Sequence, residues 1–363
     1  MRIITKYTLK ELGGPFLGAL FVLTIILAAG NIIQTADMVM NKGVDIIQVT
    51  KVFLYFLPYV LIFTIPISVL AAVLLGFGRL SGDNELTAIR TSGISLRRVI
   101  FPIVVCGVLV SLANIPLNDR ILPESEFAAR KLLQKIGMKN PAALIEPGIF
   151  VKGFQDYIVF VHNKKGDVLE DVRIYQPREG SPTRTIVAET GRITSLPGEK
   201  GVRLELLNGS ADEISPESPD EFYKISFQNY QMILNMEKVV DVDSIQKKAR
   251  EKSMKELTHD IEEMGSSVDV MPLRVELHKK LALSFSNLVF VLVGVPLAIT
   301  THRREKFVGF GMSIVLFLVY WGIMLGGIAF AIRGSIPAWA GVWSANILLS
   351  MFGIGLFYKL LRR

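Results

Sequence analysis

The residues best placed to do chemistry form a short polar segment between two long apolar runs. Asp83 or Asn84 can cap a helix, because their short side chains accept hydrogen bonds from free backbone N–H groups. Glu85 favours the positive end of a helix dipole, and Gly93 is a typical C-terminal stop. This pattern predicts about two helical turns at a membrane surface, near residues 83–93.

Two apolar side chains form one apolar face on this predicted helix. Leu86 and Ile89 lie three residues apart, and Glu85 and Arg90 flank them. A short helix of this kind can dock in a groove on a cytoplasmic partner. It can equally rest on lipid headgroups, and the residues alone leave both interpretations open.

Other chemistry is missing from the sequence. It contains no Gly-x-x-x-x-Gly-Lys-Ser/Thr phosphate loop, no Gly-x-Ser-x-Gly elbow and no His-Glu-x-x-His pair. The four histidines lack metal-ligand spacing: His162, His259, His278 and His302. We therefore expect no catalytic residues, no metal and no cofactor, and the protein is not expected to be an enzyme.

Composition indicates a membrane protein with one water-exposed insertion. Half of the 363 residues are hydrophobic, and they gather at both ends, whereas residues 117–280 carry charges throughout. Cys106 lies in an apolar run and indicates packing. Six apolar segments are long enough to span a bilayer. They are Phe16–Ile33, Val52–Phe77, Val99–Ile115, Leu281–Ile299, Val308–Ala331 and Ala338–Leu360.

Lysine and arginine in the short flanks predict the orientation, because cytoplasmic loops retain basic residues. Thirteen such residues fall on the side of the N-terminus, against three on the other side, Lys42, Lys51 and Arg333. Both termini are therefore expected in the cytoplasm and the middle domain outside, in the periplasm of a bacterium with two membranes. The basic residues adjoin apolar runs and form no separate face, so no nucleic-acid partner is expected despite the net charge of +7.

The middle domain is predicted to be β-rich. Eight runs of β-branched and aromatic residues, separated by turn residues such as Asn208-Gly209, favour a sandwich or jelly roll. They are Ile149–Phe154, Tyr157–Asn163, Val172–Gln176, Thr185–Glu189, Arg192–Leu196, Val202–Leu207, Phe222–Phe227 and Tyr230–Leu234. Helices are expected around Glu124–Ile136 and Met254–Met264, the second with a Ser253/Glu256 capping box.

The apolar segments hold almost no ionisable residues, although ion-coupled transport usually needs them at bilayer depth. Their polar residues are expected to make interhelical hydrogen bonds or to lie at boundaries: Asn31, Ser68, Asn114, Ser284, Asn287 and Asn346. A self-sufficient secondary transporter is disfavoured, which leaves a passive or externally powered device.

Several motifs in order resemble the lipopolysaccharide export permease family, LptF/LptG. The segment from Arg79 through Glu85-Leu86 to Ser92-Gly93-Ile94-Ser95 is similar to the coupling-helix region of that family. Further similar stretches are Leu144–Phe150, Phe227-Gln228-Asn229-Tyr230, Glu276-Leu277-His278-Lys279-Lys280 and Val295-Pro296-Leu297. The resemblance covers essentially the whole chain, and the Phe227–Tyr230 region favours the F-type of the two subunits.

The resemblance implies a fold, a function and a set of partners. The fold is an α-helical membrane protein of six transmembrane helices with a periplasmic β-jellyroll-like domain inserted between helices 3 and 4. Two homologous permease subunits pair and bind a cytoplasmic ABC ATPase dimer, whose ATP hydrolysis drives lipopolysaccharide from the inner membrane to a periplasmic jellyroll bridge protein. Glu85 would face the ATPase, with Leu86, Ile89 and Arg90 around it.

The same resemblance places lipid contacts near the outer end of the first span. Family members often have basic residues there, but this chain has Asn31 and Gln34, and Lys42 is the nearest cation. Contacts with lipid phosphates are therefore expected on Lys42, on Arg333 or on the partner subunit, and Asn31 and Gln34 are the other expected lipid-binding residues. The expected divisions are residues 1–116, 117–275 and 276–363.

Two other functions fit parts of the sequence. One is an ATPase-driven lipoprotein-release or mechanotransmission subunit, although such devices usually have four spans. The other is a membrane-anchored enzyme or non-transporting scaffold, which would not need the surface helix around Glu85.

Overall fold

The computed structural model describes residues 2–40, 44–139, 147–154, 157–165, 168–178, 181–195, 201–214, 222–235, 246–265, 270–301 and 306–362. The chain forms two compact units. The first comprises residues 1–30, 54–127 and 247–363, and the second comprises residues 31–53 and 128–246.

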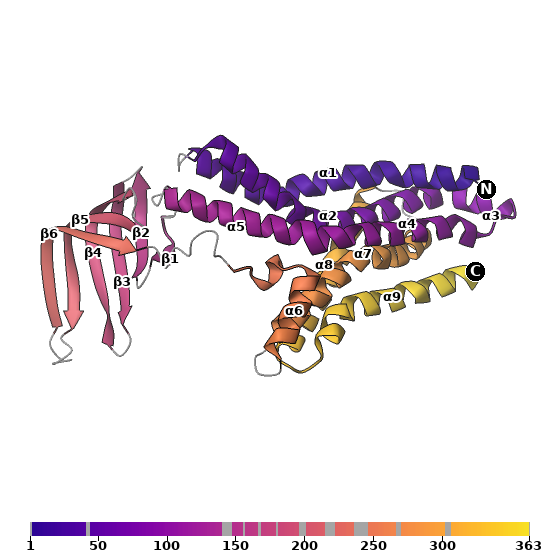
Figure 1. Ribbon diagram of the computed structural model, residues 1–363. Coiled ribbons are helices and arrows are strands. Elements are labelled where there is room, and N and C mark those ends of the chain that lie inside the picture. The colour runs from indigo at the N-terminus through magenta and orange to yellow at the C-terminus, as the bar shows by residue number, and fades with distance from the viewer. Residues whose placement is uncertain are drawn as a thin grey trace. The chain divides into compact units, whose positions relative to one another are not determined.

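Among the described residues, six helices are long and apolar enough to cross a membrane, in agreement with the predicted number of spans. Each contains one of the predicted apolar segments. They lie in α1 (Arg2–Met40), α2 (Ile46–Gly82), α4 (Leu96–Pro116), α7 (Met271–Thr301), α8 (Lys306–Ile332) and α9 (Ala338–Arg362) (Figure 1).

The third span continues past the membrane-spanning length instead of ending there. A five-residue π-helix, η1 (Leu117–Ile121), follows Pro116 and leads directly into α5 (Leu122–Lys139). The predicted helix at Glu124–Ile136 lies within α5 and is confirmed, but it is an extension of the span. A π-turn widens the helix locally and often marks a functional position.

The bundle packs around α2 and α7, which are mostly buried, whereas α1 and α8 expose most of their apolar surface. Tyr320 of α8 is completely buried, and its ring packs edge-on against Phe290 of α7 at 5.1 Å between centroids. An exposed apolar face on a spanning helix suits lipid or a second membrane subunit.

The described residues of the insertion form six antiparallel strands in one sheet, ordered as in the chain. They are β1 (Phe150–Phe154), β2 (Tyr157–Lys165), β3 (Val168–Arg178), β4 (Ser181–Ser195), β5 (Gly201–Ile214) and β6 (Phe222–Asn235) (Figure 1). The inserted β-rich domain is confirmed, but the prediction of eight strands is wrong. Two predicted pairs merge into β4 and β6, because no turn interrupts the ladder at Thr190-Gly191 or at Gln228-Asn229.

The predicted turn at Asn208-Gly209 is also wrong, because both residues lie inside β5. Asn208 has a left-handed backbone, φ 51°, and so does Asp171 of β3, φ 49°. In β3 the buried positions change from Leu169 to Val172 and Ile174, so the side-chain alternation shifts by one residue at Asp171. This shift keeps the apolar residues on both sides of Asp171 in one core cluster.

Residue 209 must be glycine because atoms of Val187 and Phe227 lie too close for a side chain. A Cβ atom at residue 209 would overlap the carbonyl oxygen of Val187 and lie 2.7 Å from Cε2 of Phe227. We expect Gly209→Ala to destabilise the sheet by about 1–3 kcal/mol, the usual cost of overpacking. Limited proteolysis of the purified full chain would show faster cleavage within the sheet. Ser210→Ala, which adds no atom, is the control, and equal resistance of both variants would contradict the prediction.

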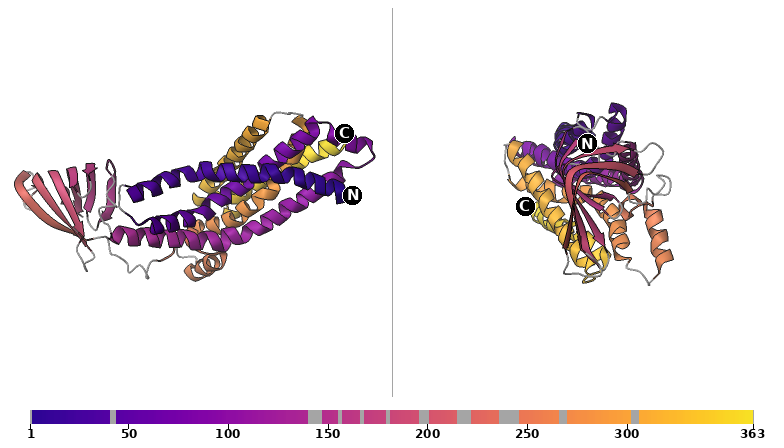
Figure 2. Two further views of the ribbon diagram at one scale, coloured as in Figure 1. Left: turned by 90° about the horizontal axis from the view of Figure 1, so that it is seen from above. Right: turned by 90° about the vertical axis from the view of Figure 1, so that its left-hand side faces the viewer.

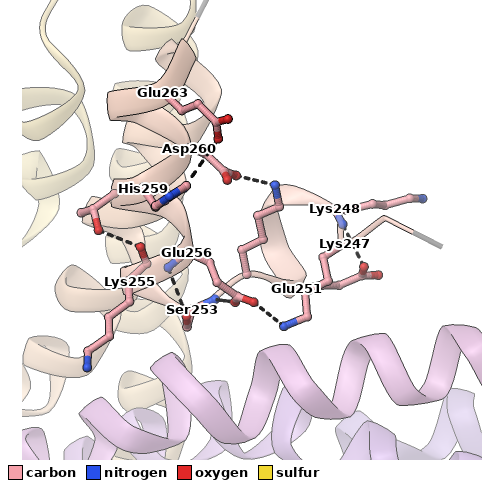
Figure 3. A network of polar contacts seen from close by, with 11 residues as sticks. Lys247, Lys248, Glu251, Ser253, Lys255, Glu256, His259, Asp260 and Glu263 are labelled. Carbon is pink, nitrogen blue, oxygen red and sulfur yellow. Dashed lines mark hydrogen bonds and ion pairs between the residues drawn. The ribbon is translucent and has the colours of Figure 1, made fainter. Parts of the chain in front are cut away.

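A polar network holds the segment that leads back to the fourth span. In α6 (Met254–Met264), the Glu256 N–H donates to Ser253 Oγ at 3.3 Å and the Ser253 N–H donates to Glu256 Oε2 at 2.7 Å. Both the predicted helix and its capping box are confirmed (Figure 3). Lys247 Nζ donates to Glu256 Oε1 at 2.6 Å, and Lys252 pairs with Asp260.

The cap makes a local prediction about stability. Ser253→Ala removes the side-chain acceptor and should cost about 1 kcal/mol of α6 stability, measured as faster hydrogen exchange of the α6 amides. Ser95→Ala is the matched control, because Ser95 occupies the N-cap of α4 without a side-chain cap hydrogen bond. Equal exchange in α6 for both variants would rule out a stabilising cap.

The same network predicts a pH dependence. Partial burial opposes ionisation of Glu256, but hydrogen bonds from Lys247 and Ser253 outweigh it, so its pKa lies below the ordinary value of 4.5. A lowered folded-state pKa stabilises the helix above the unfolded-state value, and this stabilisation disappears as the pH falls through the folded-state pKa. Exchange protection of α6 should therefore be constant near neutral pH and fall below about 4.5, and Glu256→Gln should flatten this profile.

Candidate coupling site

The predicted surface helix is present as α3 (Glu85–Thr91). Its predicted side-chain cap is wrong: Asn84 occupies the N-cap position with a left-handed backbone, φ 59°, and makes no cap hydrogen bond. The reason is the tight connection from α2. The Asp83 N–H donates to Arg79 O at 2.9 Å and the Asn84 N–H to Ser81 O at 3.1 Å, so the backbone turns before a side chain can cap.

The C-terminal stop at Gly93 is confirmed. Gly93 has φ 79°, and its N–H donates to Arg90 O at 3.0 Å. The Ile94 N–H donates to Ile89 O at 3.3 Å, which completes a Schellman motif. Glycine suits this position because a left-handed backbone costs it nothing. The helix therefore has a fixed length and a defined exit toward α4.

The apolar face of α3 is turned toward its own bundle. Leu86 is 4% exposed and belongs to the transmembrane core, and Ile89 packs against that core. Glu85 is half-buried and Arg90 is exposed. The charged edge of α3, and not its leucine, is thus the part available to another protein.

The Glu85 carboxylate is held by a residue 78 positions earlier. Tyr7 Oη of α1 donates to Glu85 Oε2 at 2.8 Å. Among the described residues, Oε1 of Glu85 has no hydrogen-bond partner. Beside this contact, Arg79 of α2 pairs with Glu11 of α1 and lies 3.6 Å from Asp83.

Both termini lie at the same end of the bundle as α3 (Figures 1 and 2). The end of α3 and the end of α9 meet around a cavity of about 290 Å³, lined by Arg90, Arg97 and Leu360 among others. A second cavity of about 410 Å³ lies beside Ile4, Arg97 and Arg98. Three arginines, Arg90, Arg97 and Arg98, therefore line the cavities at this end of the bundle.

The expected lipid-contact residues are spread over the chain. Asn31 and Gln34 lie three residues apart on α1, with Gln34 exposed. Arg333 is exposed in the turn after α8, in the other compact unit. Lys42 lies outside the described residues. Of the expected lipid-contact residues, Asn31 and Gln34 lie one helical turn apart on α1.

The intramembrane polar residues partly behave as expected. Asn346 Nδ2 of α9 donates to Ala282 O of α7 at 2.9 Å, and Asn118 Nδ2 of η1 donates to Ser284 Oγ of α7 at 3.0 Å, so these hydrogen bonds join helices. Asn287 instead bonds within α7, to Ser284 O. The side chains of Ser68 and Asn114 are buried without a hydrogen-bond partner among the described residues.

Sequence reasoning missed one buried cation. Lys280 of α7 is 3% exposed, and its Nζ donates to Asn118 O of η1 at 3.0 Å. It satisfies a backbone carbonyl in the π-turn, where the regular helical hydrogen bonding is interrupted. The available signal was that Lys280 directly precedes an apolar run. Burial of a lysine is costly unless its charged group has a partner, so a specific contact could have been expected.

No group of three or more histidine, cysteine, aspartate or glutamate side chains in the described part of the chain could hold a metal ion. In the described part of the chain, six apolar helices, an inserted antiparallel sheet and a short helix beside the basic end define a multi-pass membrane protein.

The comparisons with known proteins specify the class. Residues 6–359 match the family described as lipopolysaccharide export system permease LptF/LptG, and the chain belongs to this family. It is 20% identical over 356 residues to the lipopolysaccharide export system permease protein LptF of Escherichia coli strain K12, covering 95% of this chain and 92% of that protein. The Shigella flexneri protein of that name gives the same values.

A further relative is less well described. An uncharacterized protein of Rickettsia prowazekii, RP871, is 23% identical over 226 residues, which cover 60% of this chain and 62% of that protein. The family match confirms the resemblance read from the sequence motifs, and it identifies the chain as an inner-membrane permease of lipopolysaccharide export.

Proposed function

We propose that the chain is one transmembrane subunit of an ATP-driven ABC exporter. It pairs with a homologous permease subunit, binds a cytoplasmic ABC ATPase dimer and extracts lipopolysaccharide from the inner membrane. The lipid then passes by way of the inserted sheet domain to a periplasmic jellyroll bridge protein, toward the outer membrane. Of the two subunit types, the LptF type is favoured by the E. coli and Shigella relatives.

One observation carries the proposal. Glu85 stands on a short helix of fixed length that is anchored in the bundle through Leu86, and one of its carboxylate oxygens has no partner among the described residues. A carboxylate can accept several hydrogen bonds at once, so Glu85 can bind a basic residue of an ATPase while Tyr7 still holds it. Arg90, exposed on the other flank of the Leu86 and Ile89 face, supplies a second charged contact.

The sequence agrees with an external energy source, because it has no phosphate-loop motif of its own. The exposed apolar surfaces of α1 and α8 suit a paired permease subunit and lipid. Both termini and α3 are assigned to the cytoplasm and the sheet to the periplasm. The functional divisions are then residues 1–116, 117–275 and 276–363, and Asn31, Gln34, Lys42 and Arg333 remain the proposed lipid contacts.

Co-purification tests this function directly. The chain is co-expressed with a homologous permease subunit and the ATPase and purified through a tag on this chain. We expect the ATPase to remain bound and its hydrolysis to rise when lipopolysaccharide is added. An intact chain that retains no ATPase would overturn the exporter and favour a scaffold.

A further inference from the structure

The first span is weakly held along its length within the first compact unit. Its side chains Leu17, Phe21 and Ile26 are 64%, 68% and 58% exposed. Midway along the span, Ala19 and Leu23 form a small buried cluster with Ile67 and Ala71 of α2. A helix with so little buried surface can shift against its neighbour at low cost.

The cytoplasmic end of α1 is held much more specifically. Tyr7 Oη donates to Glu85 of α3 at 2.8 Å, and Glu11 pairs with Arg79 at the end of α2. Leu12, 8% exposed, packs against Gly76 of α2, where any Cβ atom would overlap it. These contacts fasten the beginning of α1 to the segment that carries Glu85.

We propose that Tyr7 is a positioning residue that makes Glu85 a bridge between the first span and the ATPase, an inference that rests on the proposed function. Oε2 of Glu85 stays on Tyr7, and Oε1 binds the ATPase. A hydrogen bond between a neutral donor and a carboxylate is stronger than one between neutral groups, so it fixes the carboxylate while leaving its second oxygen available.

The consequence is a mechanical link. When the ATPase displaces α3, the Tyr7 contact moves the beginning of α1 with it. From Tyr7 to Gly30 the helix is about 35 Å long at 1.5 Å per residue, and its thin packing offers little resistance to tilting. A movement made at the ATPase thus reaches the far part of the first span without passing through the buried core of α2 and α7.

The test uses Tyr7→Phe in the complete complex of both permease subunits and the ATPase. The ring remains and only the hydroxyl is lost, so we expect the amount of bound ATPase to stay unchanged. Lipopolysaccharide-stimulated hydrolysis should fall about three- to tenfold, the range for loss of one hydrogen bond. Tyr59→Phe is the matched control, because Tyr59 lies on α2 and contacts Phe63 through its ring.

A double variant separates positioning from a general structural role. If Tyr7 acts through Glu85, Tyr7→Phe combined with Glu85→Gln should be no slower than Glu85→Gln alone. The link would be overturned if the effects of the two substitutions on the hydrolysis rate multiplied, or if the Tyr7→Phe complex hydrolysed ATP at the wild-type rate. These outcomes differ from failure of the proposed function, in which the wild-type chain retains no ATPase or Glu85→Gln itself has no effect.

Discussion

Glu85→Ala should leave the complex assembled and reduce its lipopolysaccharide-stimulated ATP hydrolysis by about tenfold or more. The substitution removes the Tyr7 hydrogen bond and the proposed contact with the ATPase together. Loss of one such hydrogen bond is expected to lower the rate about three- to tenfold, so loss of both contacts corresponds to about tenfold or more. Assembly should survive, because the buried anchor of α3 is Leu86 and not Glu85.

The control for this substitution is Glu263→Ala. Glu263 is an exposed carboxylate of α6, 75% exposed, whose Oε2 lies 3.6 Å from Nδ1 of His259 (Figure 3). Its loss should change neither assembly nor hydrolysis. If Glu85→Ala matched this control, Glu85 would have no part in coupling, and another edge of α3, with Arg90, would be the place to look.

Gly327→Val should destabilise the membrane domain by about 3 kcal/mol, the upper end of the usual cost of overpacking. Helices α8 and α9 cross with their backbones in contact at Gly327 and Gly341. A Cβ atom on Gly327 would overlap the Gly341 carbonyl oxygen and lie 2.6 Å from Ser344 Oγ. Small residues let membrane helices approach this closely, so a branched side chain must push the two spans apart.

The adjacent glycine provides a matched control. A Cβ atom on Gly326 meets nothing within 4 Å, so Gly326→Val adds the same side chain one residue away without a clash. In thermal unfolding of the detergent-purified chain, the midpoint temperature should fall strongly for Gly327→Val and change little for Gly326→Val. Similar midpoints for the two variants would mean that the close crossing of α8 and α9 does not exist in the membrane.

The membrane spans, the start of α6, the end of α3 and the β-rich character of the insertion could be predicted from the sequence, because their signals lie within a few neighbouring residues. Each span is one continuous apolar run, and the hydrophobic thickness of a bilayer requires about 20 residues to cross it. The capping box of α6 involves residues three apart, Ser253 and Glu256, and the stop of α3 needs one glycine, Gly93. The β-rich character of the insertion likewise followed from β-branched and aromatic runs.

Errors arose where neighbours in space override a local signal. Asn208-Gly209 is a typical turn pair. Hydrogen-bonded pairing with β4 and β6 nevertheless keeps both residues inside β5, where Asn208 has a left-handed backbone. Asn84 is a typical cap, yet the tight exit from α2 prevents it from capping. In both cases, the backbone hydrogen bonds and the connection to the neighbouring element outweigh the local conformational preference of the residue, which contributes about 1 kcal/mol or less.

By itself, the sequence determined six spans, a β-rich insertion between the third and fourth, a short helix near Glu85 and the family. Only the tertiary structure decided that Leu86 is buried while Glu85 is held by Tyr7, 78 residues away, and that Lys280 is buried against the π-turn. The physical reason is distance along the chain. Periodicity and capping report interactions within a few residues, whereas these contacts depend on how separate helices pack, which no local pattern encodes.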